Sequence, residues 1–320
     1  MAYSHISIGQ VAAGVAPVIR KIEIKDVCDA LAEGLNDFLA MPTHAAFLAL
    51  VYSLCGLLLA YATSAQNALQ LLFPLASGFA LVGPFVAVGL YEMSRRRELG
   101  LEISWKYAFN VLRSPSIPSI AALGALLLTI FAAWIVASQL LYMALYGPTP
   151  PVFFVDFLQQ VASTERGWLL VAVGCFIGFY FAAVTLAISV VSFPLLLDRD
   201  AGAFIAVATS INTVRKNPIP MALWGLIVAA ALLIGSLPFF MGLTLVLPVL
   251  GHATWHLYRK VIVRDPAREQ PAIRAEEEMS QSAHDPVSDD GRHEKFHAAT
   301  CSALTVKDRR GSAAKSAHSG

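Results

Sequence analysis

The stretch SIAALGALLLTIFAAWIVASQLLYMALY, residues 119–146, decides the fold class of this chain. It contains no charged residue and is apolar on every side of a helix, whereas a helix of a water-soluble domain keeps a polar face. About 20 consecutive apolar residues let a helix cross the hydrocarbon core of a bilayer. The stretch therefore predicts a transmembrane helix.

The rest of the chain follows the same pattern. Of its 320 residues, 57% are hydrophobic and 14% are charged, against about a quarter charged in ordinary soluble domains. Asp, Glu, Lys and Arg are absent from residues 38–91, 114–155, 167–197 and 217–258. We expect spanning helices at about 44–62, 69–91, 118–145, 168–194, 219–237 and 239–257. The predicted fold is an all-α membrane protein with about six transmembrane helices; whether residues 219–257 form two spans or one span plus a re-entrant segment stays open.

The basic residues test this count, because cytoplasmic flanks of membrane helices are enriched in Lys and Arg. With both termini in the cytoplasm, Arg166 is the basic residue expected in the outside loops. A five-span arrangement would place Arg259 and its neighbours outside. In the six-span arrangement, the inside flanks hold Arg20, Lys21, Lys25, Arg95, Arg96, Arg97, Lys106, Arg113, Arg199, Arg215, Lys216, Arg259, Lys260 and Arg264.

An internal repeat accompanies the spans. Three cytoplasmic segments are amphipathic and each meets a proline just before a span, which suits the first turn of a new helix. We expect three helical hairpins, each preceded by a cytoplasmic interfacial helix. The apolar faces are Val27, Leu31, Leu35, Phe38 and Leu39 before Pro42; Trp105, Ala108, Phe109 and Leu112 before Pro115 and Pro118; and Phe204, Val207, Ala208, Ile211 and Val214 before Pro218.

Composition divides the chain into three parts. Residues 18–264 form the predicted six-span membrane domain, preceded by a disordered lead, residues 1–17. Residues 265–320 are rich in charge, Ser, Ala and His and hold one aromatic residue, Phe296. Such a segment buries too little apolar area to offset its ordering entropy, so we expect a disordered cytoplasmic tail.

Two histidines stand out in GHATWHLYRK, residues 251–260. His252 and His256 are four apart and therefore share one helix face. Three interpretations stay open: the polar end of a membrane helix, ligation of a metal or haem, and a proton-handling or gating role. Aromatic and basic neighbours are typical of the membrane–water interface and favour the first.

His44 and Asp198 extend the metal hypothesis, because the six-span arrangement places them at the same cytoplasmic depth as His252 and His256. Imidazoles with a carboxylate suit zinc or non-haem iron. Asp198 also lies in LLLDRDAG, residues 195–202, which reads equally as a helix end followed by an N-cap at Asp200. We expect no cofactor.

The basic residues Arg95, Arg96, Arg97, Arg259 and Lys260 are candidates for contact with anionic lipid headgroups or a protein partner. Each is also explained as a topological anchor at the membrane edge. The net charge is +1 and no folded basic domain is present, which excludes nucleic acid as a partner.

Several segments together resemble the DUF2189 family, bacterial predicted integral membrane proteins known as a domain of unknown function. The resemblance covers about residues 18–264. It implies a bacterial inner membrane and brings no activity or functional residues. The segments are DFLAMPTHAAFLAL (37–50), LLFPLASGFALVGPFVAVGLYEMSRRRELG (71–100), VLRSPSIPSI (111–120), SVVSFPLLLDRDAG (189–202) and LPVLGHATWHLYRK (247–260).

The functional prediction is a non-enzymatic membrane scaffold or interaction protein with a cytoplasmic working face and partners still to be identified. The first alternative is a transporter for a neutral or lipid-like solute, because proline-broken helices can line a path with free carbonyls. The second is a metal- or haem-binding membrane protein. An enzyme is the least expected, since the sequence shows no acid–base pair and no charged residue in mid-membrane.

Overall fold

The computed structural model describes residues 17–41, 54, 61, 69–104, 111, 114–149, 153–237 and 241–264. Contacts divide the chain into two units, Met1–Arg264 and Asp265–Gly320, and every described residue lies in the first. The helices are α1 (Ile24–Ala40), η1 (Leu69–Leu71), α3 (Leu72–Val86), α4 (Val88–Glu98), α6 (Ile117–Tyr146), α7 (Phe154–Ser163), α8 (Glu165–Ser189), α9 (Ser192–Asp198), α10 (Ala203–Lys216), α11 (Pro218–Ser236) and α12 (Leu243–Val261). The predicted all-α class is confirmed for these residues, in which strand-like pairing is limited to one bridge, Ile19 to Ile262.

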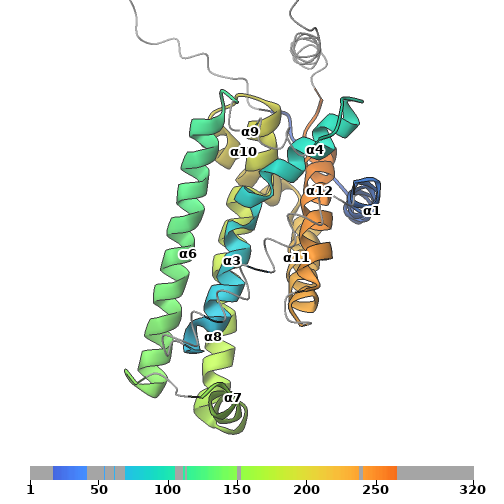
Figure 1. Ribbon diagram of the computed structural model, residues 1–320. Coiled ribbons are helices and arrows are strands. Elements are labelled where there is room, and N and C mark those ends of the chain that lie inside the picture. Colours follow the sequence, from blue (N-terminus) through green and yellow to red (C-terminus); the bar gives the residue numbers. More distant parts are fainter. Residues whose placement is uncertain are drawn as a thin grey trace, which may run out of the picture. The chain divides into compact units, whose positions relative to one another are not determined.

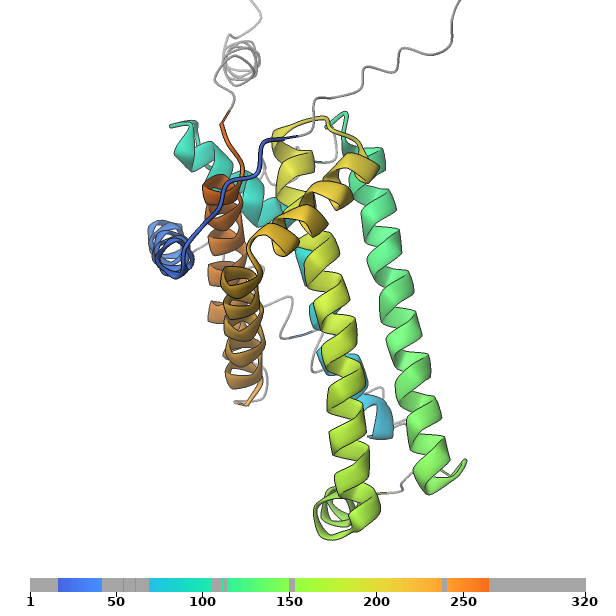
Figure 2. The same ribbon diagram turned by 180° about the vertical axis from the view of Figure 1, so that it is seen from behind.

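Four helical segments of the described chain are long and apolar enough to cross a membrane. They are Phe73–Glu98, formed by α3 and α4; Ile117–Tyr146, formed by α6; Glu165–Asp198, formed by α8 and α9; and Pro218–Ser236, formed by α11. They coincide with the spans predicted at 69–91, 118–145, 168–194 and 219–237. Figures 1 and 2 show α6 and α8 side by side along their length.

The first and sixth predicted spans are not among these four segments. The first, 44–62, lies outside the described residues except for Leu54 and Tyr61. The sixth, 239–257, corresponds to α12, which is a helix but not one of the four candidate spans. Its second half carries His252, His256, Arg259 and Lys260, which lower the mean hydropathy of the whole helix. The count of six and the three-hairpin arrangement therefore stay predictions.

Two of the candidate spans are broken near prolines. Ala87 ends α3 and starts α4 three residues after Pro84, and Val191 separates α8 from α9 before Pro194. Proline lacks the amide hydrogen that the helix ladder needs. At the break between α8 and α9, the backbone amide of Val191 donates to the hydroxyl of Ser210 on α10, at 3.2 Å. The breaks redirect α4 and α9 at the same end of the bundle, where they pack against each other.

We call this end the charged end: α1, α4, α9, α10 and the C-terminal half of α12, at the top of Figure 1. Much of the buried core lies there, including Phe193, Leu195 and Trp255. Away from it the spans are largely uncovered, since 6% of the most apolar window of Glu165–Asp198 is buried within the protein. Exposed apolar side chains such as Phe176 and Phe179 are those expected to face lipid.

Helix α1 lies across α12 and is seen end on beside it in Figure 1. Its buried positions are Val27, Ala30, Gly34 and Asp37, spaced three and four apart as one helix face requires. A Cβ atom on Gly34 would lie 2.4 Å from the backbone nitrogen of Ala253, so glycine is needed for this close crossing.

Two of the three segments predicted as interfacial helices are helical, and their position at the membrane interface stays a prediction. The first is α1, but its predicted apolar face divides: Val27 packs on α12, whereas Leu35 and Leu39 are exposed. The third is α10, which buries small residues including Ala206 and Ser210 and leaves Phe204 exposed. The second, 105–112, lies outside the described residues except for Val111.

Candidate functional site: a buried polar network at the charged end

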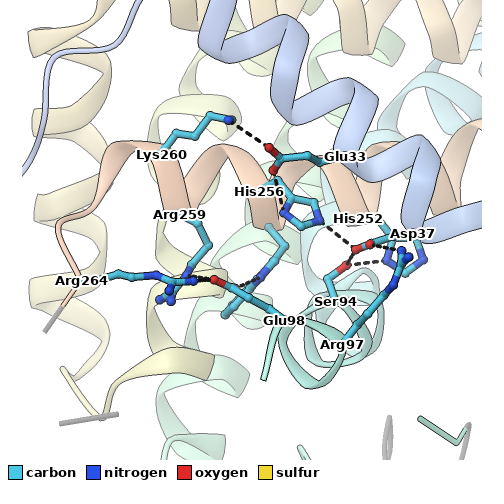
Figure 3. Close-up of polar contacts among 11 residues, drawn as sticks. Glu33, Asp37, Ser94, Arg97, Glu98, His252, His256, Arg259, Lys260 and Arg264 are labelled. Carbon is cyan, nitrogen blue, oxygen red and sulfur yellow. Dashed lines mark hydrogen bonds and ion pairs between the residues drawn. The ribbon is translucent and has the colours of Figure 1, made fainter. Parts of the chain in front are cut away.

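Three helices contribute side chains to one polar network. Helix α1 supplies Glu33 and Asp37, which are four residues apart and therefore share a face. Helix α4 supplies Ser94 and Arg97 from its last turns. Helix α12 supplies His252, His256 and Lys260, which are four residues apart. Figure 3 shows these side chains pointing toward α1 and α4.

Asp37 is the centre of the network. Its Oδ2 accepts a hydrogen bond from the Ser94 hydroxyl at 2.5 Å and lies 2.8 Å from Nε2 of His256. Its Oδ1 pairs with the Arg97 guanidinium at 2.5 Å. Burial raises the pKa of the Asp37 carboxyl, but the hydrogen bonds from His256 and Ser94 and the electrostatic interaction with His256 outweigh burial, so the pKa is lowered. Asp37 is therefore ionised and fully partnered.

His256 bridges the two carboxylates of α1. Its Nδ1 lies 3.1 Å from Oε2 of Glu33, and its Nε2 faces Asp37. The imidazole ring therefore lies between two acceptors, and its contacts tie Glu33 and Asp37 of α1 to α12. Glu33 also accepts from the Lys260 ammonium at 3.1 Å, which adds a second tie between α1 and α12.

His252 is the innermost member of the network and is 0% exposed. Its Nδ1 lies 2.7 Å from the Ser94 hydroxyl oxygen. Because the one hydroxyl hydrogen of Ser94 goes to Asp37, Nδ1 of His252 must donate to the serine oxygen. Nε2 of His252 is buried, and the ring also lies against the backbone of Leu90 on α4.

A second cluster lies beside the first, where α4, α9 and α12 meet. The hydroxyl of Tyr258 donates to Asp198 at 2.6 Å. Arg259 pairs with Glu98 at 3.1 Å and lies 3.6 Å from Asp198, so one guanidinium joins two helices. The Trp255 indole also donates to Glu98, at 3.1 Å, and Arg264 pairs with the same carboxylate.

The middle of the chain is similar to a known protein family. Residues 72–198 match the family model described as Predicted integral membrane protein (DUF2189). This region is similar to that family, and we call residues 72–198 the DUF2189 region. No curated protein and no solved structure matches the chain significantly.

The DUF2189 region holds only part of the site. It runs from α3 to α9 and includes Ser94, Arg97, Glu98 and Asp198, whereas α1 and α12 lie on either side of it in the sequence. The network therefore fastens the flanking helices onto the DUF2189 region. The matched residues lie within the wider range, 18–264, for which the sequence predicts the resemblance, and the match covers residues 72–198 of it.

The proposed metal ligands have separate partners. His252 and His256 share the expected face of α12, but one bonds Ser94 and the other bonds Asp37. Asp198 bonds Tyr258, and His44 lies outside the described residues. Within the described chain, no group of three or more His, Cys, Asp or Glu side chains is arranged to hold a metal ion. Metal binding stays a prediction.

The five basic residues predicted to contact headgroups all have acceptors within the protein. Arg97, Arg259 and Lys260 bind Asp37, Glu98 and Glu33, as described above. Arg95 lies 3.4 Å from Glu92, and the Arg96 guanidinium donates to the carbonyl of Glu102 at 2.9 Å. Arg97 and Arg259 join the DUF2189 region to α1 and α12, Lys260 joins α12 to α1, and the contacts given for Arg95 and Arg96 lie within the region. Headgroup contact stays a prediction.

Sequence reasoning missed Glu33, Asp37, Ser94 and Glu98. A signal for part of this set exists, because charged residues at the edges of the charge-free windows lie at one depth. Asp37 and Glu92 border the window 38–91, and Asp198 and Arg259 end two later ones. Ser94 has no such signal, because a serine near a helix end is common.

Proposed function

We propose that this protein is a non-enzymatic, multi-pass inner-membrane scaffold or interaction protein that works through its charged end. That end faces the cytoplasm, together with both termini. The observation that carries the proposal is the Asp37-centred network, which fixes α1 across α12.

The network makes α1 a rigid arm rather than a loosely attached helix. Separating α1 from α4 and α12 would break the contacts of Asp37 with Ser94, Arg97 and His256 together. The docked position is preferred because these contacts form as one set. The close crossing of Gly34 over Ala253 fixes the same position by shape. A fixed arm keeps its exposed polar side, which includes Lys25 and Asn36, available to a partner.

The buried Ser94, His252 and Asp37 do not support hydrolytic chemistry. In a catalytic triad the histidine lies between the serine and the carboxylate, so that it can take the serine proton. Here the Ser94 hydroxyl donates directly to Asp37. Ser94 and His252 are also 1% and 0% exposed, which closes them to a substrate.

The described helix breaks give limited support to a transporter. Broken helices serve transport where their freed backbone groups line a path. The amide freed at Val191 is bound by Ser210 of α10. That contact uses the break to attach α10 to the bundle and favours a structural role for it.

Site-specific photo-crosslinking in cells of the source organism tests the proposal. A photoreactive residue at Asn36, on the exposed polar side of α1, should give discrete protein adducts. The same residue at Phe176, on the exposed surface of α8, is the matched control and should give lipid adducts. The adducts at Asn36 should decrease in an Asp37→Asn background, because α1 is no longer fixed. Identical lipid adducts at both positions would contradict the proposal.

A further inference from the structure

Helix α7 lies at the end of the bundle opposite the charged end, in a segment that the sequence analysis treated as a loop. It is strongly amphipathic. Val155 and Leu158 form an exposed apolar side, at 70% and 48% exposure. Asp156 and Gln159 are also exposed and lie on the polar side of the helix. A short helix that exposes this much apolar surface needs a nonaqueous environment for that side.

The direction of α7 is fixed by its corner with α8. The Thr164 hydroxyl accepts from the backbone amide of Gly167 at 3.0 Å and caps α8. The same hydroxyl donates to the carbonyl of Gln160 at 2.7 Å. A Cβ atom on Gly167 would lie 2.1 Å from the carbonyl oxygen of Val161, so the two helices meet backbone to backbone. Figure 1 shows α7 end on at the lower end of α8.

Aromatic side chains fasten the inner side of α7 to α6. The ring of Phe157 lies edge-on to Tyr142 and Tyr146, with centroids 6.1 and 6.3 Å apart. The Tyr142 hydroxyl donates to the carbonyl of Thr149 at 3.0 Å. Aromatic residues with a polar tip are enriched where the membrane meets water. The cluster therefore marks the depth at which α7 crosses the ends of α6 and α8.

We propose that α7 lies in the lipid–water interface of the bilayer surface opposite the charged end, with Val155 and Leu158 in contact with acyl chains. The neighbouring spans also expose apolar residues toward this end of the bundle, Leu140 on α6 and Trp168 and Leu169 on α8. In this placement, lipid surrounds both the apolar side of α7 and the exposed surfaces of α6 and α8. This inference is independent of the proposed function.

The length of α8 agrees with this placement. Its 25 residues rise about 37 Å at about 1.5 Å per residue. A hydrocarbon core of about 30 Å leaves α7 at the boundary of the acyl chains and the headgroups. Interfacial helices bury their apolar face about 5–10 Å into that boundary. Because α7 carries the acidic Asp156 and no Lys or Arg, apolar insertion rather than headgroup attraction holds it there.

Fluorescence quenching tests the inference. In full-length protein with Cys28, Cys55, Cys175 and Cys301 replaced by Ser, an environment-sensitive fluorophore is attached at Leu158→Cys or, as the matched control, at Asp156→Cys. The protein is placed in phosphatidylcholine nanodiscs with and without lipids that carry a nitroxide on the acyl chain. The label at position 158 should emit at shorter wavelength and be quenched several-fold more than the label at 156.

Two results would overturn the inference. Equal, weak quenching with emission typical of water at both positions would place α7 outside the bilayer. Short-wavelength emission at 158 without quenching by the nitroxide lipids would mean that protein covers this side, as in a complex with a second copy. Circular dichroism of both labelled variants confirms that their helix content equals that of the parent.

Discussion

Replacing Asp37 with Asn removes the charge on which the network depends and keeps the shape of the side chain. The Asp37 side chain is 7% exposed. Breaking a buried ion pair costs about 3–5 kcal/mol. The Arg97 side chain is 37% exposed, so water recovers part of that loss. We expect unfolding to become easier by roughly 2–3 kcal/mol.

The assay is thermal unfolding in mild detergent, followed by tryptophan fluorescence, because Trp255 is buried on α12. A loss of 1 kcal/mol lowers the Tm of a protein of this size by about 2–4 °C. Asp37→Asn should therefore lower the Tm by roughly 4–12 °C. The matched control is Asp29→Asn on the same helix, away from the buried positions of α1, which should change stability by less than about 0.5 kcal/mol. Equal Tm values for the two variants would refute the reasoning.

The same comparison has a defined pH dependence. The pKa of Asp37 is lowered in the folded protein, so this carboxylate contributes stability above its unfolded pKa. That contribution is lost as the pH falls through the folded pKa and Asp37 becomes protonated. The Tm difference between the parent and Asp37→Asn should be constant from neutral pH to about pH 5 and shrink below about pH 4. If the Tm difference grew on acidification, the Asp37 contribution would increase at low pH, which would contradict a lowered pKa.

The remaining predictions concern the crossing of α1, the topology and the histidines. Gly34→Ala should lower the Tm by several degrees, because the added Cβ would meet the Ala253 backbone. The control is Gly83→Ala, whose Cβ would meet no atom within 4 Å and should not lower the Tm. Equal Tm shifts for the two variants in thermal scans would contradict this. Reporters fused after residues 147 and 164 should lie outside the cytoplasm, and reporters fused after residues 100, 216 and 264 should lie in the cytoplasm. A cytoplasmic reporter signal at residue 147 would contradict the six-span topology. Elemental analysis and absorbance should find no stoichiometric metal or haem in the parent, and a metal lost in the double variant His252→Ala/His256→Ala would make this a cofactor protein.

The spanning helices could be predicted from the sequence because the signal is local. Each charge-free window reports the environment of its own residues, and four of the predicted spans coincide with helices of the right length and composition. Helix α12 was harder, because one continuous helix combines an apolar half with a half that carries His256 and Arg259. A hydropathy pattern predicts the membrane depth of such a helix end, but it does not predict which other helix packs against it.

The network could not be predicted because its contacts join distant parts of the chain. Asp37 bonds Ser94, 57 residues away, and His256, 219 residues away. The sequence placed His252 and His256 correctly on one face, and that face does carry polar chemistry. It could not show that the partners would be a serine and a carboxylate, because those come from α4 and α1. The choice of partner depends on how three helices cross.

The same reasoning explains why charged residues gather at one end of this bundle in pairs. A charge at the edge of a hydrocarbon core is costly unless a partner lies at the same depth. Helices that start and stop at one depth bring such residues together, as Glu98 and Asp198 meet Arg259. Helix α1 contributes Asp37 from outside the candidate spans to this layer. Its position is thus set by the charges of the other helices, which is why Asp37→Asn should loosen α1 while leaving the spans inserted.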